Sequence, residues 1–460
     1  PPREARLGLR VDRLFAIAYP ERTSGLATVV ATAPHLRDLR GQRVYFSLTL
    51  PAGTAPPIRS ATLAAIGVLA SLPPAPPADT FEGYLATAGI NFRFSRGRLL
   101  ATTDPGSAYQ QFCAAAAAAF HRWLGLGIAE KRPALAALLR AMMLGQTHEL
   151  SDEQHGLFMQ SGTMHLFAIS GLNIGVVAGA LQALMLLLRL PAWPRFALGT
   201  VLLWLFVDIT GGAPSAVRAF VMAVFFQAAF VLRRPRNLLA ALAASALLVL
   251  LAAPLQVFGA SFLMSYGIVA ALLLLGLPLG EAWLKFWTPW RALPVAAWHR
   301  VHHAVAAGWR FLASALAVGL ATSLVSILTG LQYFGLLTPG GLVANLLLIP
   351  AAMAVTLAGF ASLACGLVGF ESGAVLANHA GALVLLVIES AVRLGVAVPG
   401  AFFAARFAAP WVGPVALAAL LLALVLGYAG NWEKRVGGWW PPFAVVAVTL
   451  IGGVNYGAVS

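Results

Sequence analysis

Two kinds of hydrophobic pattern divide the chain near residue 110. Before that point, short runs rich in β-forming residues alternate with Gly and Pro turns, which predicts strands. The clearest runs are 26–33, 42–50 and 61–72. We expect residues 1–110 to form a small β-barrel or sandwich domain, since about 110 residues suffice for a five-stranded barrel. The proline-rich run 73–80 is expected to be an extended connector.

Residues 111–161 are predicted to form amphipathic helices at the edge of a membrane. Ser151 is placed to cap one of them, and Gln154 stands at the third helical position, as a capping box requires. Gly162 can end that helix and turn the chain into lipid.

Beyond Gly162 the chain is a series of about ten apolar segments, judged against the roughly 20 residues that a helix needs to cross a bilayer. We therefore predict a polytopic α-helical membrane protein in which residues 162–460 form the membrane domain. The eighth segment contains four polar or charged residues and is expected to be interfacial, pore-lining or a span. The segments are 164–188, 196–210, 213–232, 238–256, 258–279, 311–330, 340–366, 374–395, 410–429 and 441–458.

Composition supports a membrane protein. The chain is 60% hydrophobic and only 10% charged, against about 25% charged residues in soluble domains. Its net charge of +14 could suggest nucleic acid, but membrane proteins also keep Lys and Arg in cytoplasmic loops. With residues 1–110 outside, eleven of the fourteen basic residues beyond Gly162 fall in inside loops.

The remaining charges are the informative ones. The loops predicted to lie outside, around Gly211, Pro254 and Pro339, contain no Lys or Arg, as the positive-inside rule requires. Three basic residues are left without a topological explanation: Arg218, Arg393 and Arg406.

Signs of an enzyme or of a cross-linked secreted protein are missing from the sequence. It has no P-loop, no HExxH pair and no GxSxG turn, so we expect no catalytic residue, cofactor or metal site. Cys113 and Cys365 lie far apart and imply no disulfide framework. The chain starts without a methionine or signal peptide, and we expect it to be a piece of a longer protein.

Arg218 is the first candidate functional residue. It lies in the run TGGAPSAVRAFVM, about five residues into the third segment, where a lipid-facing arginine would cost roughly 2–3 kcal/mol near the bilayer centre. Gly211, Gly212 and Ser215 favour a broken helix start whose backbone N–H groups could face an anion. The alternative is that Arg218 extends to the outer interface.

The first apolar segment begins with polar residues and glycines. Ser170 and Gly171 could break the helix beside a water-filled path, with His165 and Asn173 facing it. The alternatives are close helix packing on glycines spaced four residues apart and a buried, hydrogen-bonded His165. Ser261, Ser265 and Asn345 are further polar residues in apolar surroundings; singly each is typical of helix packing, and together they outline a possible polar path.

The run NFRFSRGRLL places arginines among aromatic residues in the predicted barrel. Phe92 and Phe94 with Arg93, Arg96 and Arg98 would suit base stacking and phosphate contact. The same alternation is typical of a half-buried strand, which is the interpretation that the pattern favours. Residues 1–110 contain twelve arginines and seven acids, an excess that permits anion attraction.

The run from 138 to 179 closely resembles the signature region of ComEC-type competence proteins. The family's motif G-x-x-H-L-x-A-I-S-G-L is usually followed by histidine, and this chain has Asn173 at that position. The resemblance continues through the runs GGAPSAVRAFVM, SFLMSYG and NLLLIP. The motif G-x-x-H-L-x-A-I-S-G-L is matched by Gly162, His165, Leu166, Ala168, Ile169, Ser170, Gly171 and Leu172.

The resemblance implies a channel that moves single-stranded DNA across the bacterial inner membrane, with an OB-like domain on the periplasmic side. It also implies a cytosolic ATPase or helicase that drives transport and a periplasmic or surface DNA receptor. The HxHxDH zinc motif of the family's nuclease domain does not occur in the sequence, so we expect no nuclease activity in this chain. Degradation of the other strand would then need a separate nuclease or a missing segment.

Two other functions remain open at this stage. A secondary transporter of a small anionic solute would use similar broken helices but predicts paired intramembrane acids, and Glu389 is almost the only candidate. An intramembrane hydrolase using Ser170 and His165 is weaker, because their five-residue offset suits neither adjacent helical turn.

Overall fold

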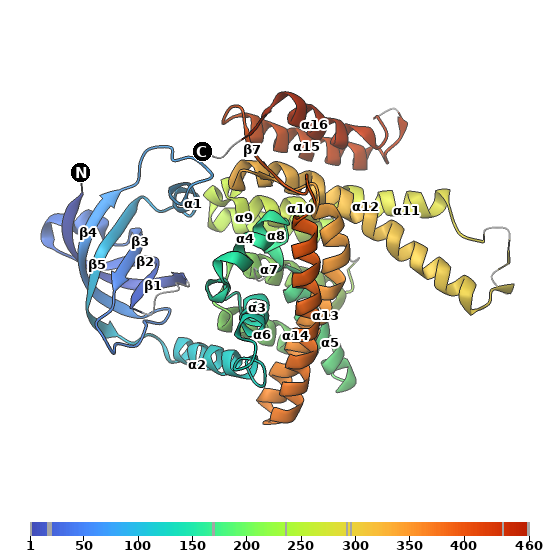
Figure 1. The fold of residues 1–460 in the computed structure, drawn as a ribbon. Coiled ribbons are helices and arrows are strands. Elements are labelled where there is room, and N and C mark those ends of the chain that lie inside the picture. Colours follow the sequence, from blue (N-terminus) through green and yellow to red (C-terminus); the bar gives the residue numbers. More distant parts are fainter. Residues whose placement is uncertain are drawn as a thin grey trace.

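The computed structural model describes residues 2–15, 21–167, 171–234, 237–290, 293–294, 297–434 and 437–457, and the backbone alone of Leu172. Figure 1 shows a β-barrel on one side of a helical body and a helical arm on the other side.

The barrel closes in the strand order β1-β2-β3-β5-β4. β1 pairs with both β2 and β4, and β3 runs parallel to β5. Alternate residues of each strand fill the barrel core, as in β4, where Leu63 and Ala65 are buried. This confirms the predicted five-stranded barrel. The strands are β1 (Arg3–Phe15), β2 (Arg22–Thr32), β3 (Arg43–Thr49), β4 (Thr62–Ser71) and β5 (Phe92–Asp104).

Two short helical elements accompany the strands. The 3-10 helix η1 (Pro34–Leu39) joins β2 to β3. The connector 73–80 contains no helix or strand, and it leads into α1 (Phe81–Thr87). Thr80 caps α1 by accepting a hydrogen bond from the backbone N–H of Gly83.

Three helices follow the barrel, and one of them differs from the prediction. The capping box of Ser151 and Gln154 is present at the start of α4. The middle helix α3 is not amphipathic, because all of 135–139 and 141–144 is buried against α13 and α14. The elements are α2 (Ala108–Trp123), α3 (Pro133–Leu144), η2 (Thr147–Glu149), α4 (Asp152–Gln160) and η3 (Met164–Leu166).

Seven helices among the described residues are long and apolar enough to cross a membrane. The prediction of a polytopic helical membrane protein is confirmed, and the eighth predicted segment is one of these helices, α14. The third of the seven, Ala260–Phe286, contains two π-helical turns, η5 (Leu263–Gly267) and η6 (Leu272–Gly276), between α9, α10 and α11. The other six are α6 (Ala192–Ile209), α7 (Pro214–Val231), α12 (Arg300–Phe334), α13 (Gly341–Leu367), α14 (Glu371–Val396) and α15 (Val412–Ala429).

The predicted number of about ten spans is not confirmed, because three segments form shorter helices. At 1.5 Å per residue they are about 20–26 Å long, less than the roughly 30 Å hydrocarbon core. Pro254 follows the second of them, and a short strand follows the third. These helices are α5 (Gly171–Leu187), α8 (Leu238–Ala252) and α16 (Trp440–Gly452).

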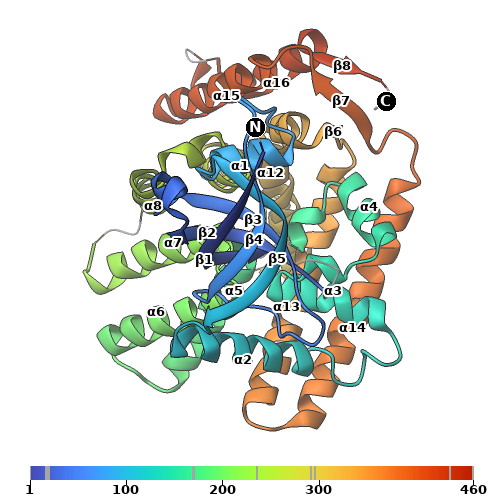
Figure 2. The same ribbon diagram turned by 90° about the vertical axis from the view of Figure 1, so that its left-hand side faces the viewer.

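Loops predicted to lie outside meet the barrel. Arg59, just before β4, reaches the end of α6, and α1 contacts the 3-10 helix η4 (Pro254–Phe258). A second sheet, made of β6 (Leu336–Leu337), β7 (Phe403–Phe407) and β8 (Val454–Tyr456), is linked to the barrel by an ion pair between Arg406 and Asp79. In Figure 2 the barrel lies in front of the helical body. The barrel and these loops therefore share one side, called the barrel side below.

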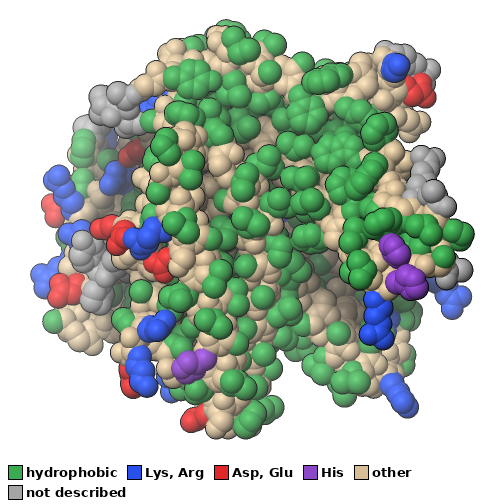
Figure 3. Space-filling model, turned by 45° about the vertical axis from the view of Figure 1, so that its right-hand side comes forward, with side chains coloured by type: hydrophobic (Ala, Val, Ile, Leu, Met, Phe, Trp, Pro, Cys, Tyr) green, Lys and Arg blue, Asp and Glu red, His purple; other side chains and the backbone are tan. Residues whose placement is uncertain are grey.

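The arm on the opposite side consists of α11 (Leu277–Phe286) and the first half of α12. At 35 residues, α12 is about 52 Å long, which exceeds the bilayer core. Figure 3 shows hydrophobic side chains over much of the helical body, with histidine and basic side chains toward the edge of this face. A broad apolar surface of this kind suits contact with lipid.

Candidate functional site

The four sequence blocks that carried the resemblance form helix starts on the barrel side. They begin α5, α7, α9 (Ala260–Phe262) and α13. α5 contacts both α7 and α13, and α7 also contacts α9. The start of α5 meets α13 in the middle of that helix, where Asn173 bonds Thr356. The first turns of the four helices contain no acidic residue, and α7, α9 and α13 have no side-chain cap. Uncapped N–H groups give a helix start a positive partial charge that attracts anions.

One face of α5 is open and made of glycine. Gly171, Gly175 and Gly179 are exposed, and a Cβ atom added at Gly175 or Gly179 would meet no described atom within 4 Å. The opposite face, which includes Ile174 and Val177, is buried in the main core. Gly171 keeps the packing interpretation, because a Cβ there would lie 3.7 Å from Cβ of Ala219 on α7, whereas no described neighbour packs against Gly175 or Gly179.

His165 lies in η3, just before the open face of α5. Its side chain is exposed, and its Nδ1 lies 3.2 Å from the carbonyl oxygen of Gly162. If the Nδ1 proton donates to Gly162, the neutral ring leaves Nε2 as an acceptor. Ser170, the other predicted group at this place, lies outside the described residues.

Asn173 is buried in protein instead of facing a cavity. Its Nδ2 donates to the backbone oxygen of Met142 at 3.0 Å, and its Oδ1 accepts from the Thr356 hydroxyl at 3.3 Å. The side chain therefore connects α5 to α3 and α13.

We expect Asn173→Ala to lower the free energy of unfolding by about 1–3 kcal/mol, because the buried Met142 carbonyl would lose its donor. Asn345→Ala is the matched control. The Asn345 Oδ1 is buried and has no hydrogen-bond partner among the described residues, so its removal leaves no partner of that oxygen unpaired and should cost less than Asn173→Ala. Thermal unfolding of the purified variants in lipid nanodiscs measures both, and an equal effect of the two substitutions would contradict the connecting role of Asn173.

Arg218 is also inside the protein, with 2% of its surface exposed. Its Nη2 donates to the backbone oxygen of Ser261 at 2.6 Å and to the Ser261 hydroxyl at 2.7 Å. Its Nε is buried and has no partner among the described residues. Arg218 therefore ties the start of α7 to the start of α9 and does not extend to the interface.

The remaining predicted path residues lie near the same helix starts. Gly211 and Gly212 have left-handed φ angles of 91° and 62° and form the turn between α6 and α7. Ser215, Ser265 and Asn345 are half-buried, whereas Ser261 is exposed.

An ion pair that we did not predict joins the barrel to the membrane domain. Arg59 Nη1 lies 2.7 Å from Oδ1 of Asp208, whose side chain is 5% exposed. The Arg59 Nε also donates to the backbone oxygen of Asp12 in β1. Burial and a hydrogen bond to Asp208 raise the pKa of the Tyr109 hydroxyl on α2. The sequence signal was a carboxylate, Asp208, inside an apolar run.

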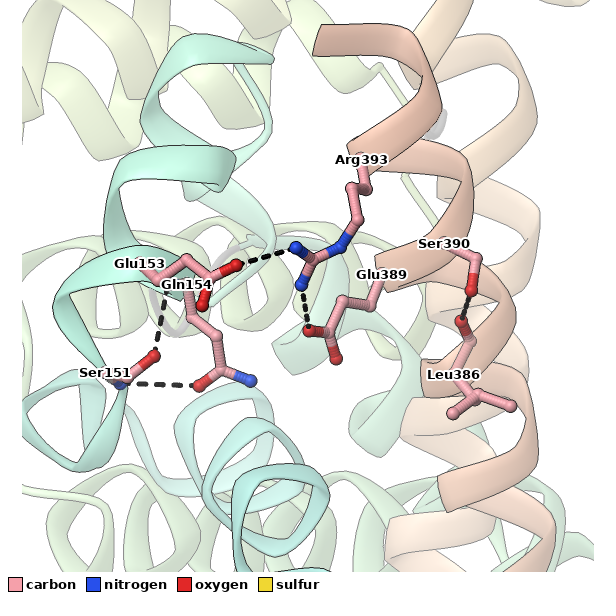
Figure 4. A network of polar contacts seen from close by, with 7 residues as sticks. All are labelled: Ser151, Glu153, Gln154, Leu386, Glu389, Ser390 and Arg393. Atoms are coloured by element: carbon pink, nitrogen blue, oxygen red, sulfur yellow. Dashed lines mark hydrogen bonds and ion pairs between the residues drawn. The ribbon is translucent and has the colours of Figure 1, made fainter. Parts of the chain in front are cut away.

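The three arginines that topology left unexplained all have partners in the structure. Arg218 binds Ser261, and Arg406 pairs with Asp79. Figure 4 shows Arg393 of α14 between two carboxylates, Glu153 of α4 at 2.6 Å and Glu389 of its own helix at 3.4 Å. These arginines therefore connect distant segments of the chain.

The arginines of β5 lie on the outer surface of the barrel. Arg93, Arg96 and Arg98 are exposed, whereas Phe94 is fully buried in the core. The interpretation of this run as a half-buried strand is confirmed, and Phe94 is not available to stack on a base. Arg93 pairs with Glu82 of α1 at 3.2 Å.

The fold and these helix starts define a multi-pass membrane protein with a barrel on one side. The family model described as Competence protein matches residues 142–430. The match covers more than half of the chain, and the chain belongs to this competence protein family.

Similarity to a curated protein is more limited in extent. ComE operon protein 3 of Bacillus subtilis (strain 168) is 29% identical over 142 residues, which cover 31% of this chain and 18% of that protein. The matched part is therefore less than a fifth of that relative. No solved structure matches the chain. In the parts of the chain that the structure describes, no group of three or more His, Cys, Asp or Glu side chains could hold a metal ion.

Proposed function

We propose that this chain forms the passage through which a single DNA strand crosses the bacterial inner membrane during competence. Its membership of the competence protein family supports a part in DNA uptake. The resemblance of its sequence blocks to those of ComEC-type proteins supports the passage itself as that part. The barrel would lie on the periplasmic side and receive the strand. A cytosolic ATPase or helicase would drive it, a surface or periplasmic receptor would deliver it, and a separate nuclease would remove the other strand.

The observation that carries the proposal is the open glycine face of α5. Gly175 and Gly179 are exposed glycines on one face of α5, and no described atom lies within 4 Å of a Cβ placed at either one. A strand of phosphates and bases could slide along bare backbone without displacing side chains. Irregular or exposed backbone at membrane depth is tolerated where it lines a hydrated path.

The electrostatics of the helix starts suit weak contact with phosphates. Uncapped N–H groups at α7, α9 and α13 attract an anion without the full charge of a lysine. The imidazole of His165 adds a polar contact beside them. A polymer that must keep moving needs contacts that are favourable enough to admit it and weak enough to release it.

No observation favours the alternative of an anionic-solute transporter coupled to ions. The two membrane-segment acids of interest, Asp208 and Glu389, are paired with Arg59 and Arg393. Such pairing leaves neither carboxylate ready for ion coupling. The hydrolase alternative requires Ser170, which lies outside the described residues, and His165 holds Gly162 through Nδ1.

Uptake of labelled DNA in a competent host tests the proposal. Deletion of the gene for the full-length protein should abolish the DNase-protected label in the cytoplasm, and plasmid expression of the protein should restore it. Normal uptake in the deletion strain would overturn the proposal. Loss of a small anionic solute from the deletion strain, with DNA uptake intact, would support the transporter instead.

A further inference from the structure

A cluster of four aromatic rings lies at one end of the barrel. Phe15 ends β1, Tyr45 lies on β3, and Phe81 and Tyr84 stand three residues apart on α1. Neighbouring ring centroids are 5.1 Å apart between Tyr45 and Phe81 and 6.0 Å apart between Phe81 and Tyr84. Phe15 lies within 6.3 Å of the other three rings. These four residues are called the aromatic platform below.

Two rings of the aromatic platform are open to solvent. Phe81 is 43% exposed and Tyr84 is 37% exposed, and their planes are 23° apart. Tyr45 belongs to the buried cluster that closes this end of the barrel, together with Leu26, Leu85 and Ile90, and Phe15 packs against it, whereas Phe81 and Tyr84 lie outside that cluster. A nearly parallel pair of exposed aromatic rings is a surface that suits a flat π-system.

Arginines border the aromatic platform. The guanidinium carbon of Arg13 lies 5.4 Å from the Phe15 ring centre, and that of Arg93 lies 5.9 Å from the Tyr45 ring centre. Arg13 also donates to the Tyr84 hydroxyl at 3.2 Å. Glu82 partly neutralises Arg93, so the net positive charge of the border is modest. Stacking would therefore contribute more than charge to any ligand held here.

We propose that Phe81 and Tyr84, the two exposed rings of the aromatic platform, stack bases of the incoming single DNA strand, with Arg13 and Arg93 close to its phosphates. This inference rests on the proposed function, because it names a place where the strand is received before it crosses the membrane. Every base has a π-face, so stacking on aromatic rings tolerates any sequence, as uptake of unrelated DNA requires. The platform also lies close to the membrane domain, since α1 contacts η4.

The test measures binding of the full chain in lipid nanodiscs by fluorescence anisotropy. The probes are a labelled oligothymidylate of about 20 nucleotides, longer than one barrel's footprint, and an abasic oligomer of equal length. The abasic probe keeps the phosphates and removes the bases. We expect wild type to bind oligothymidylate at least about fivefold more tightly, since each stacked base contributes a measurable share of affinity.

Variants separate stacking from apolar packing. Phe81→Leu keeps most of the apolar volume but removes the π-face, and Tyr84→Phe keeps the ring. We expect Phe81→Leu to lose the preference for bases and Tyr84→Phe to retain it. Leu100→Ala on β5 removes a 45% exposed apolar side chain outside the platform and should bind like wild type. Thermal unfolding of each variant identifies any that fail to fold.

The proposal is overturned if folded Phe81→Leu binds oligothymidylate as tightly as wild type, or if wild type does not distinguish the two probes. Uptake in cells is scored separately. If wild type restores uptake and Phe81→Leu binds oligothymidylate as wild type does, the aromatic platform is not a DNA-binding site, and the proposal that the chain forms the passage still stands. Failure of wild type to restore uptake would count against the passage itself, whatever the binding data show.

Discussion

Gly175→Leu is expected to reduce DNA uptake by at least about tenfold while the protein reaches the membrane in normal amounts. Gly175 is the middle residue of the open face of α5, and no described atom lies within 4 Å of a Cβ placed there. The Cβ of a leucine would therefore meet no neighbour, and the rest of the side chain would project into the space that we assign to DNA. A tenfold slower passage needs only about 1.4 kcal/mol of added barrier.

Gly308→Leu is the matched control for this experiment. Gly308 lies on the arm part of α12, is exposed, and also has no described atom within 4 Å of an added Cβ. The two substitutions therefore carry the same helix-propensity and apolar-surface changes. Uptake should remain at the wild-type level with Gly308→Leu and should fall in graded fashion from Gly175→Ala to Gly175→Leu. Equal uptake by both leucine variants would exclude the glycine face from the path.

Arg59→Ala is expected to produce the largest loss of stability, about 2–3 kcal/mol. It would leave the carboxylate of Asp208, which is 5% exposed, without its cation. Breaking a wholly buried pair in this way costs about 3–5 kcal/mol, and the 40% exposure of Arg59 lets water replace part of its effect. The barrel would also lose one of its attachments to the membrane domain, so uptake should fall with stability.

Two further variants show whether the cost comes from the unpaired carboxylate. Arg59→Ala combined with Asp208→Asn should recover part of the midpoint of thermal unfolding, because the remaining amide carries no charge. Arg98→Ala removes an exposed arginine of β5 from the barrel surface and should change stability by less than about 0.5 kcal/mol. If Arg59→Ala unfolds at the same temperature as Arg98→Ala, the ion pair does not hold the barrel.

Local patterns explain why much of the fold could be predicted. Alternation of period two marks the strands of the barrel, and the capping box of Ser151 and Gln154 appears where the sequence placed it. Apolar segments marked most membrane-domain helices, but α11 lies mostly beyond the predicted segment 258–279, and apolar residues continue past other helix ends. After Ala252 the backbone leaves the α-helix while the sequence remains apolar, and after Gly452 it forms a short strand, which explains two of the three short helices.

The polar contacts of the site could not be predicted, because they join residues far apart in the chain. Arg59 and Asp208 are 149 residues apart in sequence, and Arg393 and Glu153 are 240 apart. The sequence pattern shows that a charged residue lies in an apolar segment, where it is unfavourable without a partner, but it does not identify that partner. Asn173 illustrates the same limit, since the motif placed it beside the path and the fold turned its side chain toward Met142.

The glycine face shows a different limit. Spacing of four residues places Gly171, Gly175 and Gly179 on one side of a helix, and such a stripe usually packs against another helix. Whether a neighbour fills the space depends on the arrangement of α6, α7 and α13 around α5, which local sequence does not determine. The spacing of these glycines is therefore compatible with a packing surface and with an open path, and only the positions of the surrounding helices distinguish the two.

Photo-crosslinking of DNA during uptake tests the path most directly. A photoreactive amino acid would replace Gly175 or Gly179 on the open face, Val177 on the buried face, or Gly308 on the arm. We expect illumination during uptake to attach labelled DNA at positions 175 and 179, and not at 177 or 308. Crosslinks that are absent from 175 and 179, or equally strong at all four positions, would contradict a passage along α5.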